Sequence, residues 1–318
     1  MEHIRAAGMV ASDDIKEFPL IGIRQGKNMT NKNNTHTLRC RTPRLIIWSH
    51  DVLFLGTCLS RQEPYRTTQE LMVVCLEGSL TIRRPDAPPV STRSCLIAPG
   101  TWLDKKLIEG QQAVLAIYFL APFSQDYSAL ASRMTDLGNG LRCHHLEEPA
   151  VIRAMTEARN RAVITPTEAR TLVRDTLIPP ALQGLTFREY DTRALTIARR
   201  IRENLHDSPS LASLANEVNL SESRLEKLFK EQAGLPITQY RVRYRVFIST
   251  IIMALGYSVT EAALLAGFSN SAHLSRCYRQ VNGVTPSSTF LHPPYLDSVL
   301  DDSATALVDP LLEGQPTT

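Results

Sequence analysis

The stretch SVTEAALLAGFSNSAHLSRCYRQVNG, residues 258–283, decides the fold of the C-terminal part of the chain. Ser258 and Glu261 stand at the S-x-x-E spacing of a capping box, which begins a helix. The apolar residues that follow recur at helical spacing and are Val259, Ala262, Ala263 and Ala266. Gly267 supplies a turn residue without a Cβ, and we expect Ser269 to cap a second helix. The stretch therefore predicts two short helices joined by a tight turn.

The same plan occurs earlier in the chain, in SLASLANEVNLSESRLEKLFKEQAG, residues 210–234. Ser221 occupies the N-cap position of the second helix of this segment. Leu225 corresponds to Leu274, and Gly234 to Gly283, at one offset of 49 residues. Glycine at that position is typical of a helix end. The chain thus predicts two helix-turn-helix units, at about 211–232 and about 259–282.

Between the two units lies PITQYRVRYRVFISTIIMALGY. A single helix over residues 236–254 would be about 28 Å long, at a rise of about 1.5 Å per residue. Major-groove faces on one side of B-DNA recur every ~34 Å. The spacer is therefore long enough to bring both second helices into adjacent turns of one groove, which predicts that one subunit contacts two neighbouring turns of duplex.

The outward faces of the two second helices are polar and basic. The residues expected to contact DNA are Ser221, Ser223, Arg224, Glu226, Lys227 and Lys230 in the first unit and Asn270, Ser271, His273, Arg276 and Arg279 in the second. Residues 191–290 carry twelve Lys and Arg against eight Asp and Glu, a net charge of +4 in a chain whose total is +3. The positive excess lies in the segment with the repeat, which favours nucleic acid as the partner.

The segment from about 198 to 290 resembles the DNA-binding domain of the AraC/XylS family of bacterial transcription regulators. The resemblance rests on LASLANEVNLSESRLEKLFKEQAG and SVTEAALLAGFSNSAHLSRCYRQVNGVTP. In that family the second helix of each unit reads bases. The resemblance therefore implies base contacts from Ser223, Glu226, Lys227, Ser271, His273 and Arg276, with phosphate contact as the alternative for each. Arg276 suits a bidentate contact to guanine.

The chain departs from the family pattern in two places. Family members usually close the second unit with Tyr-Arg, whereas Thr289, Phe290 and Leu291 stand here. The spacer is also more apolar than usual, with Phe247, Ile248 and Ile251 where charged residues often occur. Two interpretations stay open for these side chains: additional packing inside the domain, or a surface that docks the N-terminal domain and transmits a signal.

The N-terminal half has a different pattern of apolar and polar residues. Residues 44–122 alternate short apolar runs, such as LMVVCL and AVLAIYFL, with turn residues, and this predicts an antiparallel sandwich or barrel. The region is similar to the cupin-like effector domain of many such regulators. Helical patterns from about 125 to 180 resemble the family's dimerisation region, although a helical lid over the sheet would show the same spacing.

The predicted fold class is therefore α+β in two domains, the second of them all-α. We expect a flexible N-terminal arm at 1–40, a cupin-like effector-binding and dimerisation domain at 41–180, a linker at 181–192, an AraC-type DNA-binding domain at 193–291 and an acidic, disordered tail at 292–318.

Ligand chemistry in the N-terminal half is sparse. Catalytic cupins bind metal through paired His and Glu, yet no His occurs between His50 and His144. We therefore predict no metal, no cofactor and no catalytic residues. A sheet without metal suits a small-molecule effector, and Trp48, Tyr65 and Trp102 are the candidate lining residues, with ordinary core positions as the alternative.

The sequence favours a cytoplasmic, homodimeric, sequence-specific transcription regulator that responds to an effector and activates by recruiting RNA polymerase to promoter DNA. No apolar run approaches the ~18 residues of a membrane span, and the six cysteines form no CxxC pair. The alternatives are a metal-dependent cupin enzyme fused to a DNA-binding module, and a regulator that senses a protein partner.

Overall fold

The computed structural model describes residues 42–59, 65–84, 87–103, 112–292 and 295–313. The expected arm at 1–40 lies outside these residues. The N-terminal part is built on a sheet of eight strands in the linear order β10-β11-β7-β4-β9-β2-β1-β12. Their bounds are β1 Arg44–Trp48, β2 Asp51–Leu59, β4 Leu71–Glu77, β7 Ser94–Ile97, β9 Gln112–Phe119, β10 Thr135–Gly138, β11 Leu141–Cys143 and β12 Asp297–Leu300. Two small sheets accompany it, β3 (Tyr65–Arg66) with β8 (Trp102–Leu103), and β5 (Leu80–Arg84) with β6 (Ala87–Thr92).

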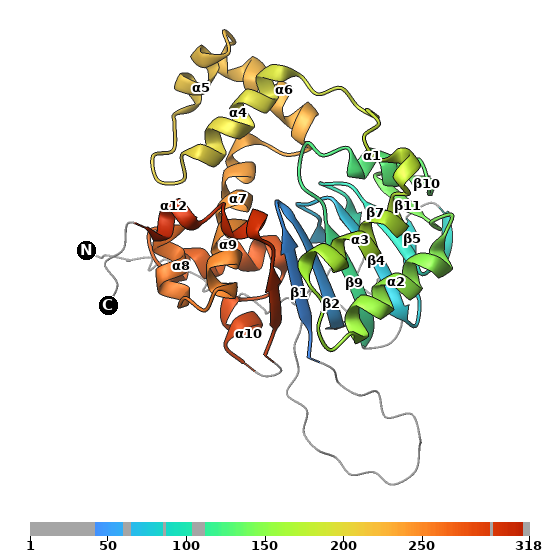
Figure 1. The fold of residues 1–318 in the computed structure, drawn as a ribbon. Helices are drawn as coiled ribbons and strands as arrows, with labels where there is room; N and C mark the ends of the chain where they lie inside the picture. Colours follow the sequence, from blue (N-terminus) through green and yellow to red (C-terminus); the bar gives the residue numbers. More distant parts are fainter. Residues whose placement is uncertain (1–41, 60–64, 85–86, 104–111, 293–294, 314–318) are drawn as a thin grey trace, which may run out of the picture.

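Two helices cover one face of the main sheet (Figure 1). They are α2 (Glu148–Asn160) and α3 (Pro166–Leu177), which follow the short α1 (Asp126–Ala131). Val151, Met155 and Val173 of these helices are fully buried against strand residues such as Met72 and Leu96. The helical region therefore serves as a lid over the sheet, the alternative that the sequence left open, whereas its role in dimerisation stays a prediction.

The C-terminal part is helical, as expected. After the one-turn helix η1 (Pro180–Leu182) come α4 (Thr192–Glu203), α5 (Leu211–Glu217), α6 (Glu222–Ala233), α7 (Ile237–Ala254), α8 (Val259–Leu265), α9 (Ser271–Asn282) and α10 (Pro286–Phe290). Figure 1 shows α4, α5 and α6 above the sheet, with α7 running down from them to α8 and α9. The α+β organisation in two parts is confirmed, and the cupin-like description of the sheet stays a prediction.

The two halves of the helical part have different cores. The buried residues of α4, α5, α6 and the start of α7 form a core of their own. Leu214, Leu225 and Phe229 are among its fully buried members. The rest of α7, with α8 and α9, shares one continuous core with the free face of the main sheet. Ile248 and Ile251 of α7 are 0% exposed in that shared core. The apolar stretch of the spacer therefore packs inside the helical part, against α8 and α9, and also faces the N-terminal sheet, whereas transmission of a signal stays a prediction.

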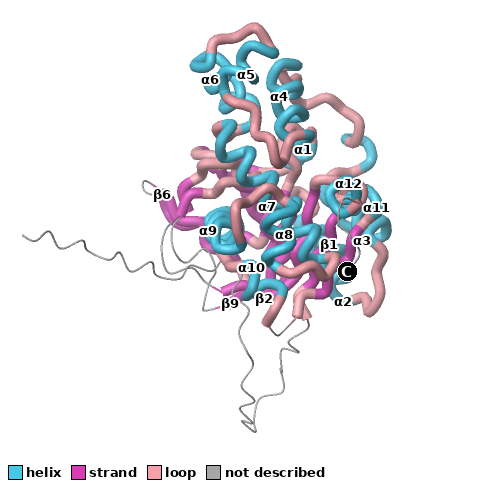
Figure 2. Tube along the Cα trace, turned by 90° about the vertical axis from the view of Figure 1, so that its left-hand side faces the viewer, coloured by secondary structure: helices cyan, strands magenta, loops and turns pink. Residues whose placement is uncertain are grey.

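The prediction of a disordered tail at 292–318 is wrong for residues 297–312. β12 pairs with β1 in parallel, in the register Arg44 to Asp297, and α11 (Asp302–Thr305) and α12 (Asp309–Leu312) follow it. Ala304 and Val308 are fully buried in the shared core. Acidic composition suggested disorder, but the acids alternate with apolar residues that bury against the sheet. Figure 2 shows α11 and α12 next to each other.

Candidate nucleic-acid interface

The first helix-turn-helix unit forms as the local sequence predicts. Ser221 caps α6 by accepting a hydrogen bond from the backbone N–H of Arg224, and Gly234 ends the helix with φ of +75°. In the turn before Ser221, Asn219 has φ of +54°, a conformation that Asn tolerates better than most residues. The buried stripe of α6 consists of Leu225, Phe229 and Ala233.

The outer face of α6 carries the predicted DNA-contacting residues. Ser223, Arg224, Lys227 and Lys230 are exposed, and Glu226 is half-buried. Lys227 approaches Glu231 at 4.0 Å on the surface, a contact of such exposed charges that is worth only ~0–1 kcal/mol. Lys227 can therefore leave Glu231 for a phosphate or a base at little cost.

The second unit differs from the prediction at one residue. Ser258 and Glu261 form the predicted capping box at the start of α8, and Gly267 takes φ of +78° in the turn. The N-cap of α9, however, is Asn270, whose side chain accepts from the backbone N–H of His273. The predicted cap at Ser269 is wrong, because the helix begins one residue later and Ser269 lies beside the His273 ring instead.

The outer face of α9 presents one exposed cation near its middle, Arg276. Among the described residues Arg276 has no carboxylate within 4.0 Å, so no ion pair has to break before it contacts DNA. His273 is more constrained, since its Nδ1 lies 3.2 Å from the Ser269 hydroxyl and its ring meets the edge of Phe268 at 5.3 Å. Ser271 and Arg279 are half-buried on the same helix.

The spacer helix α7 has 18 residues, which gives a length of about 27 Å. Two of its arginines anchor the loop that joins α4 to α5. Arg245 donates to the Ser208 hydroxyl at 2.9 Å and to the Leu205 carbonyl, and Arg241 donates to the Pro209 carbonyl. These two cations brace the first unit on the spacer, and burial lowers the pKa of each.

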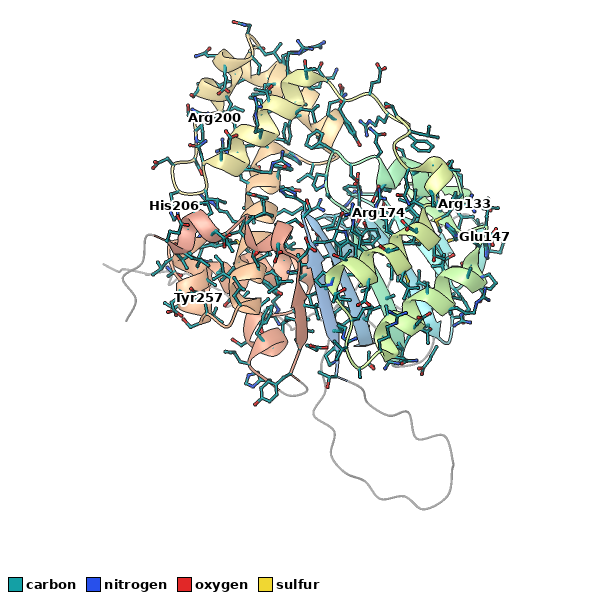
Figure 3. All side chains as sticks on the ribbon, viewed as in Figure 1. Arg133, Glu147, Arg174, Arg200, His206 and Tyr257 are labelled. Atoms are coloured by element: carbon teal, nitrogen blue, oxygen red, sulfur yellow. The ribbon has the colours of Figure 1, made fainter. Side chains whose placement is uncertain are left out.

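Electrostatic contacts also hold the helices of the first unit together. Arg200 of α4 lies on the outer surface (Figure 3) and meets Glu217 of α5 at 3.5 Å. Arg188, before α4, donates to the carbonyl of Glu231 at the end of α6 at 2.8 Å. The unit is therefore braced at both ends.

The predicted effector residues are not brought together. Trp48 is 2% exposed under α2 and α3, with its ring 5.7 Å from Tyr118. Trp102 is 57% exposed and holds the Arg66 guanidinium 5.6 Å from its ring. The side chain of Tyr65 lies outside the described part of the chain. Their role in effector binding stays a prediction.

A cavity of about 90 Å³ lies elsewhere, between the free face of the main sheet and α7, and none of the three predicted residues lines it. Arg202, Arg243 and His50 do line it. Sequence reasoning missed these residues, because they come from three distant segments. One local signal was available: Arg243 is a charged residue on the buried side of α7, between Tyr240 and Val246.

Two further observations concern other classes of site. In the part of the chain that the structure describes, no three His, Cys, Asp or Glu side chains gather as a metal site would require. His145, one of the adjacent Cys143–His144–His145 group, is buried, and its Nε2 lies 3.1 Å from the Leu177 carbonyl. Within the same described residues, none of the helices has the length and apolarity to span a membrane.

Comparison with known proteins places the repeat in a family. Residues 214–291 match the family model described as a helix-turn-helix domain. The transcriptional regulator RipA of Corynebacterium glutamicum is 28% identical over 96 residues, covering 30% of this chain and 29% of that protein. GbdR of Pseudomonas aeruginosa is 30% identical over 91 residues, 28% of this chain and 25% of that protein.

The arabinose operon regulatory protein of Salmonella typhimurium is 28% identical over 99 residues, covering 30% of this chain and 35% of that protein. Among solved structures, ToxT of Vibrio cholerae aligns with 73% of this chain and 96% of its own, at 14% identity and a TM-score of 0.44. The chain thus matches about a third or less of the length of these curated relatives. The C-terminal part of the chain is a helix-turn-helix domain of the AraC type.

Proposed function

We propose that the protein is a sequence-specific DNA-binding transcription regulator that reads two adjacent major-groove segments with one subunit. The observation that carries the proposal is the pair of capped helix-turn-helix units, α5–α6 and α8–α9, at the two ends of the 18-residue helix α7. The helix α7, about 27 Å long, is somewhat shorter than the ~34 Å between successive groove faces, and α8 adds to its reach before α9 begins.

The residues divide into two roles. The exposed Lys230 and Arg224 contact phosphates and supply affinity that falls with salt. Arg276 reads a guanine, since a guanidinium matches the O6 and N7 acceptors in the major groove. Asn270 and Ser221 act first as helix caps, so their contribution to DNA binding comes through the position of the helix and its N-terminal amides.

Regulation follows from the two separate cores. The second unit shares its core with the sheet, whereas the first unit has its own core, against which Phe123 of the N-terminal part packs. An effector or a partner that changes how the first unit packs at this contact shifts the population of arrangements in which both units fit one duplex. The protein acts in the cytoplasm as a homodimer and activates transcription by recruiting RNA polymerase; these assignments rest on the family resemblance. Light scattering of the purified chain tests the dimer.

The proposal is tested by selecting bound sequences from a random DNA library with the full chain, and by measuring affinity for the best sequence as a function of salt. We expect a site whose two half-elements are separated by about one helical turn. Lys227→Ala should weaken binding and reduce the salt dependence. The matched control is Arg153→Ala, an exposed cation on α2, which should change neither. Protection of no sequence, or of a single short element, would refute the proposal.

The enzyme alternative predicts a different result. A metal-dependent cupin enzyme fused to a DNA-binding module would carry stoichiometric iron, manganese or zinc, which elemental analysis of the purified chain detects. The relatives are named as transcription regulators, and our proposal assigns the chain no catalytic activity. A regulator that senses a protein partner would bind that partner in a pull-down and show no shift in thermal stability with small molecules.

A further inference from the structure

The segment that follows the second helix-turn-helix unit returns to the N-terminal sheet. We call residues 295–313, which contain β12, α11 and α12, the strap. The match to the helix-turn-helix family model ends at residue 291, so the strap lies outside the domain to which DNA binding is assigned. A role for the strap has to come from its contacts.

The strap closes one edge of the main sheet (Figure 1). β12 pairs with β1 in parallel over four residues. The backbone N–H of Asp297 donates to the Pro43 carbonyl, and that of Asp301 donates to the Ile47 carbonyl, each at 2.9 Å. Both ends of β12 are therefore tied to β1.

Polar contacts continue beyond β12 to the β1–β2 turn and to α3. The Ser303 hydroxyl accepts from the backbone N–H of Ser49 at 2.9 Å and donates to the Asp301 carboxylate. The hydrogen bonds from Ser303, with smaller effects of the Arg170 charge and the Thr167 hydroxyl of α3, hold the pKa of Asp301 below its usual range. The strap therefore contacts both the sheet and the helices that cover its other face.

Apolar side chains of the strap complete the core that the sheet shares with the second unit. Ala304 and Val308 are 0% exposed and lie in the same continuous core as Ile251 of α7 and Leu274 of α9. β12 also lies against α7. The strap thus joins the second unit to the sheet at the seam where α7 meets β1.

The first unit is connected to the N-terminal part by different contacts. The Phe123 ring meets Phe229 of α6 at 5.8 Å and Tyr240 of α7 at 6.1 Å, both edge to face. A Cβ on Gly234, at the end of α6, would lie 3.0 Å from Pro99. The two units are therefore connected twice, once through α7 and once through the sheet, and the strap belongs to the second connection.

The strap is held less firmly than the strands inside the sheet. All residues of β12 are half-buried, whereas all residues of β1 are buried. β12 is an edge strand, and parallel pairing is slightly less stable per residue than antiparallel pairing. Segments with few buried contacts open locally before the core of a protein does, so the strap is suited to opening by itself.

We propose that residues 295–313 are a releasable strap that fixes the second helix-turn-helix unit on the N-terminal sheet. With the strap docked, the sheet holds the two units at one separation. With the strap released, the second unit turns more freely against the sheet, and the two units fit duplexes whose half-elements are spaced differently. This effect on DNA rests on the proposed function, whereas docking and release of the strap do not depend on DNA.

Hydrogen exchange of the full chain tests the release. In the wild type, we expect the amides of the strap to exchange faster than those of β2 and β9. Ala304→Asp places a carboxylate in the shared core and should speed exchange of the strap at least about tenfold, with β2 and β9 unchanged. The matched control is Ala306→Asp, at an exposed position of the same segment, which should change neither.

Two results of the exchange experiment would overturn the inference. If Ala304→Asp speeds exchange of β2 and β9 as much as that of the strap, the strap unfolds only with the whole sheet and is not releasable. If Ala304→Asp and Ala306→Asp affect the strap equally, burial of Ala304 does not hold it.

A disulfide tests the same contact in the opposite direction. Ser49 and Ser303 are exposed neighbours, so Ser49→Cys with Ser303→Cys brings two thiols within reach of each other. In a Cys40→Ser background, the other native cysteines are buried. Oxidation should slow exchange of the strap, and dithiothreitol should restore the wild-type rate. Unchanged exchange in the oxidised form would contradict the proposal.

Anisotropy on the selected DNA site supplies the functional readout. The probes are that site and versions in which the spacing of the half-elements is altered by one base pair. Wild type, Ala306→Asp and the oxidised double-cysteine variant should bind the altered spacings at least about fivefold more weakly, and Ala304→Asp less than about twofold more weakly. Equal discrimination by Ala304→Asp and wild type would show that the strap does not set the separation. A failure of DNA binding in every sample refutes the proposed function, and hydrogen exchange still decides whether the strap is releasable.

Discussion

Replacement of Arg44 should be among the most destabilising single changes in the sheet. Its side chain is 11% exposed and links three segments. Nη1 donates to the carbonyls of Ala158 and Arg161 at 3.0 and 2.9 Å, Nη2 to that of Ala162 at 3.4 Å, and Nε to Asp297 at 2.7 Å. The three carbonyls belong to the C-terminal end of α2, where a helix has no partners of its own for them.

The magnitude follows from burial. A hydrogen bond to a charged group contributes ~1.5–3 kcal/mol, and Arg44→Met removes several at once, leaving buried carbonyls without donors. Since these contributions overlap, we expect a loss of about 3–5 kcal/mol in the free energy of unfolding. The carboxylate of Asp297 is 42% exposed, so Asp297→Asn should cost ~1 kcal/mol or less.

Urea unfolding of the full chain measures both values. In a Trp102→Phe background, Trp48 is the remaining tryptophan, and it lies on β1 four residues from Arg44 with 2% exposure. The fluorescence emission of Trp48 therefore reports the unfolding of β1. If Arg44→Met costs less than Asp297→Asn, or if the two costs are equal, the carbonyls of α2 do not depend on Arg44 and the reasoning is refuted.

Three other predictions concern DNA, backbone and pH. Arg276→Ala should cost about 1–3 kcal/mol on the best DNA site and relax one base position in a selection experiment; equal weakening on all sequences would show a phosphate contact. Gly267→Ala places a Cβ 2.5 Å from the Leu205 carbonyl oxygen at φ of +78° and should cost roughly 3 kcal/mol in thermal unfolding. Gly256→Ala, at φ of +99° with nothing within 4 Å, should cost about 1. Burial raises the pKa of Glu70 from 4.5 to about 7, so the folded chain keeps a proton that the unfolded chain releases. Stability should therefore fall by on the order of 2–3 kcal/mol as pH rises from 4.5 to 7, and Glu70→Gln should flatten that part of the profile.

The two helix-turn-helix units could be predicted from sequence because their signals are local. The capping box at Ser258, the cap at Ser221 and the αL glycines Gly234 and Gly283 act within one turn of the helix they define. The displaced cap at Asn270 shows the limit of such signals, since Ser and Asn are nearly equal as caps and stand next to each other here.

The rest depends on contacts between residues far apart in the chain. β12 has four half-buried residues whose partner strand lies 253 residues earlier, and no local pattern specifies such a pairing. From the sequence, Trp48 could line a pocket or belong to the core. The structure places it in the core, because it faces the side of the sheet that α2 and α3 cover. The cavity is likewise lined by residues of the β1–β2 hairpin, α4 and α7, and no local sequence pattern indicates that these segments meet.

The parallel pairing of β12 with β1 has a consequence for biosynthesis. Ribosomes deliver the N-terminal strands first, yet the outer edge of β1 receives its neighbour only after residues 297–300 have left the exit tunnel. Until then, unpaired amides and carbonyls of β1 stand open to any other nascent chain. Premature termination between α10 and this strand would yield a product that keeps both helix-turn-helix units but has an unpaired edge at β1. Cellular quality control would recognise such a product by that edge.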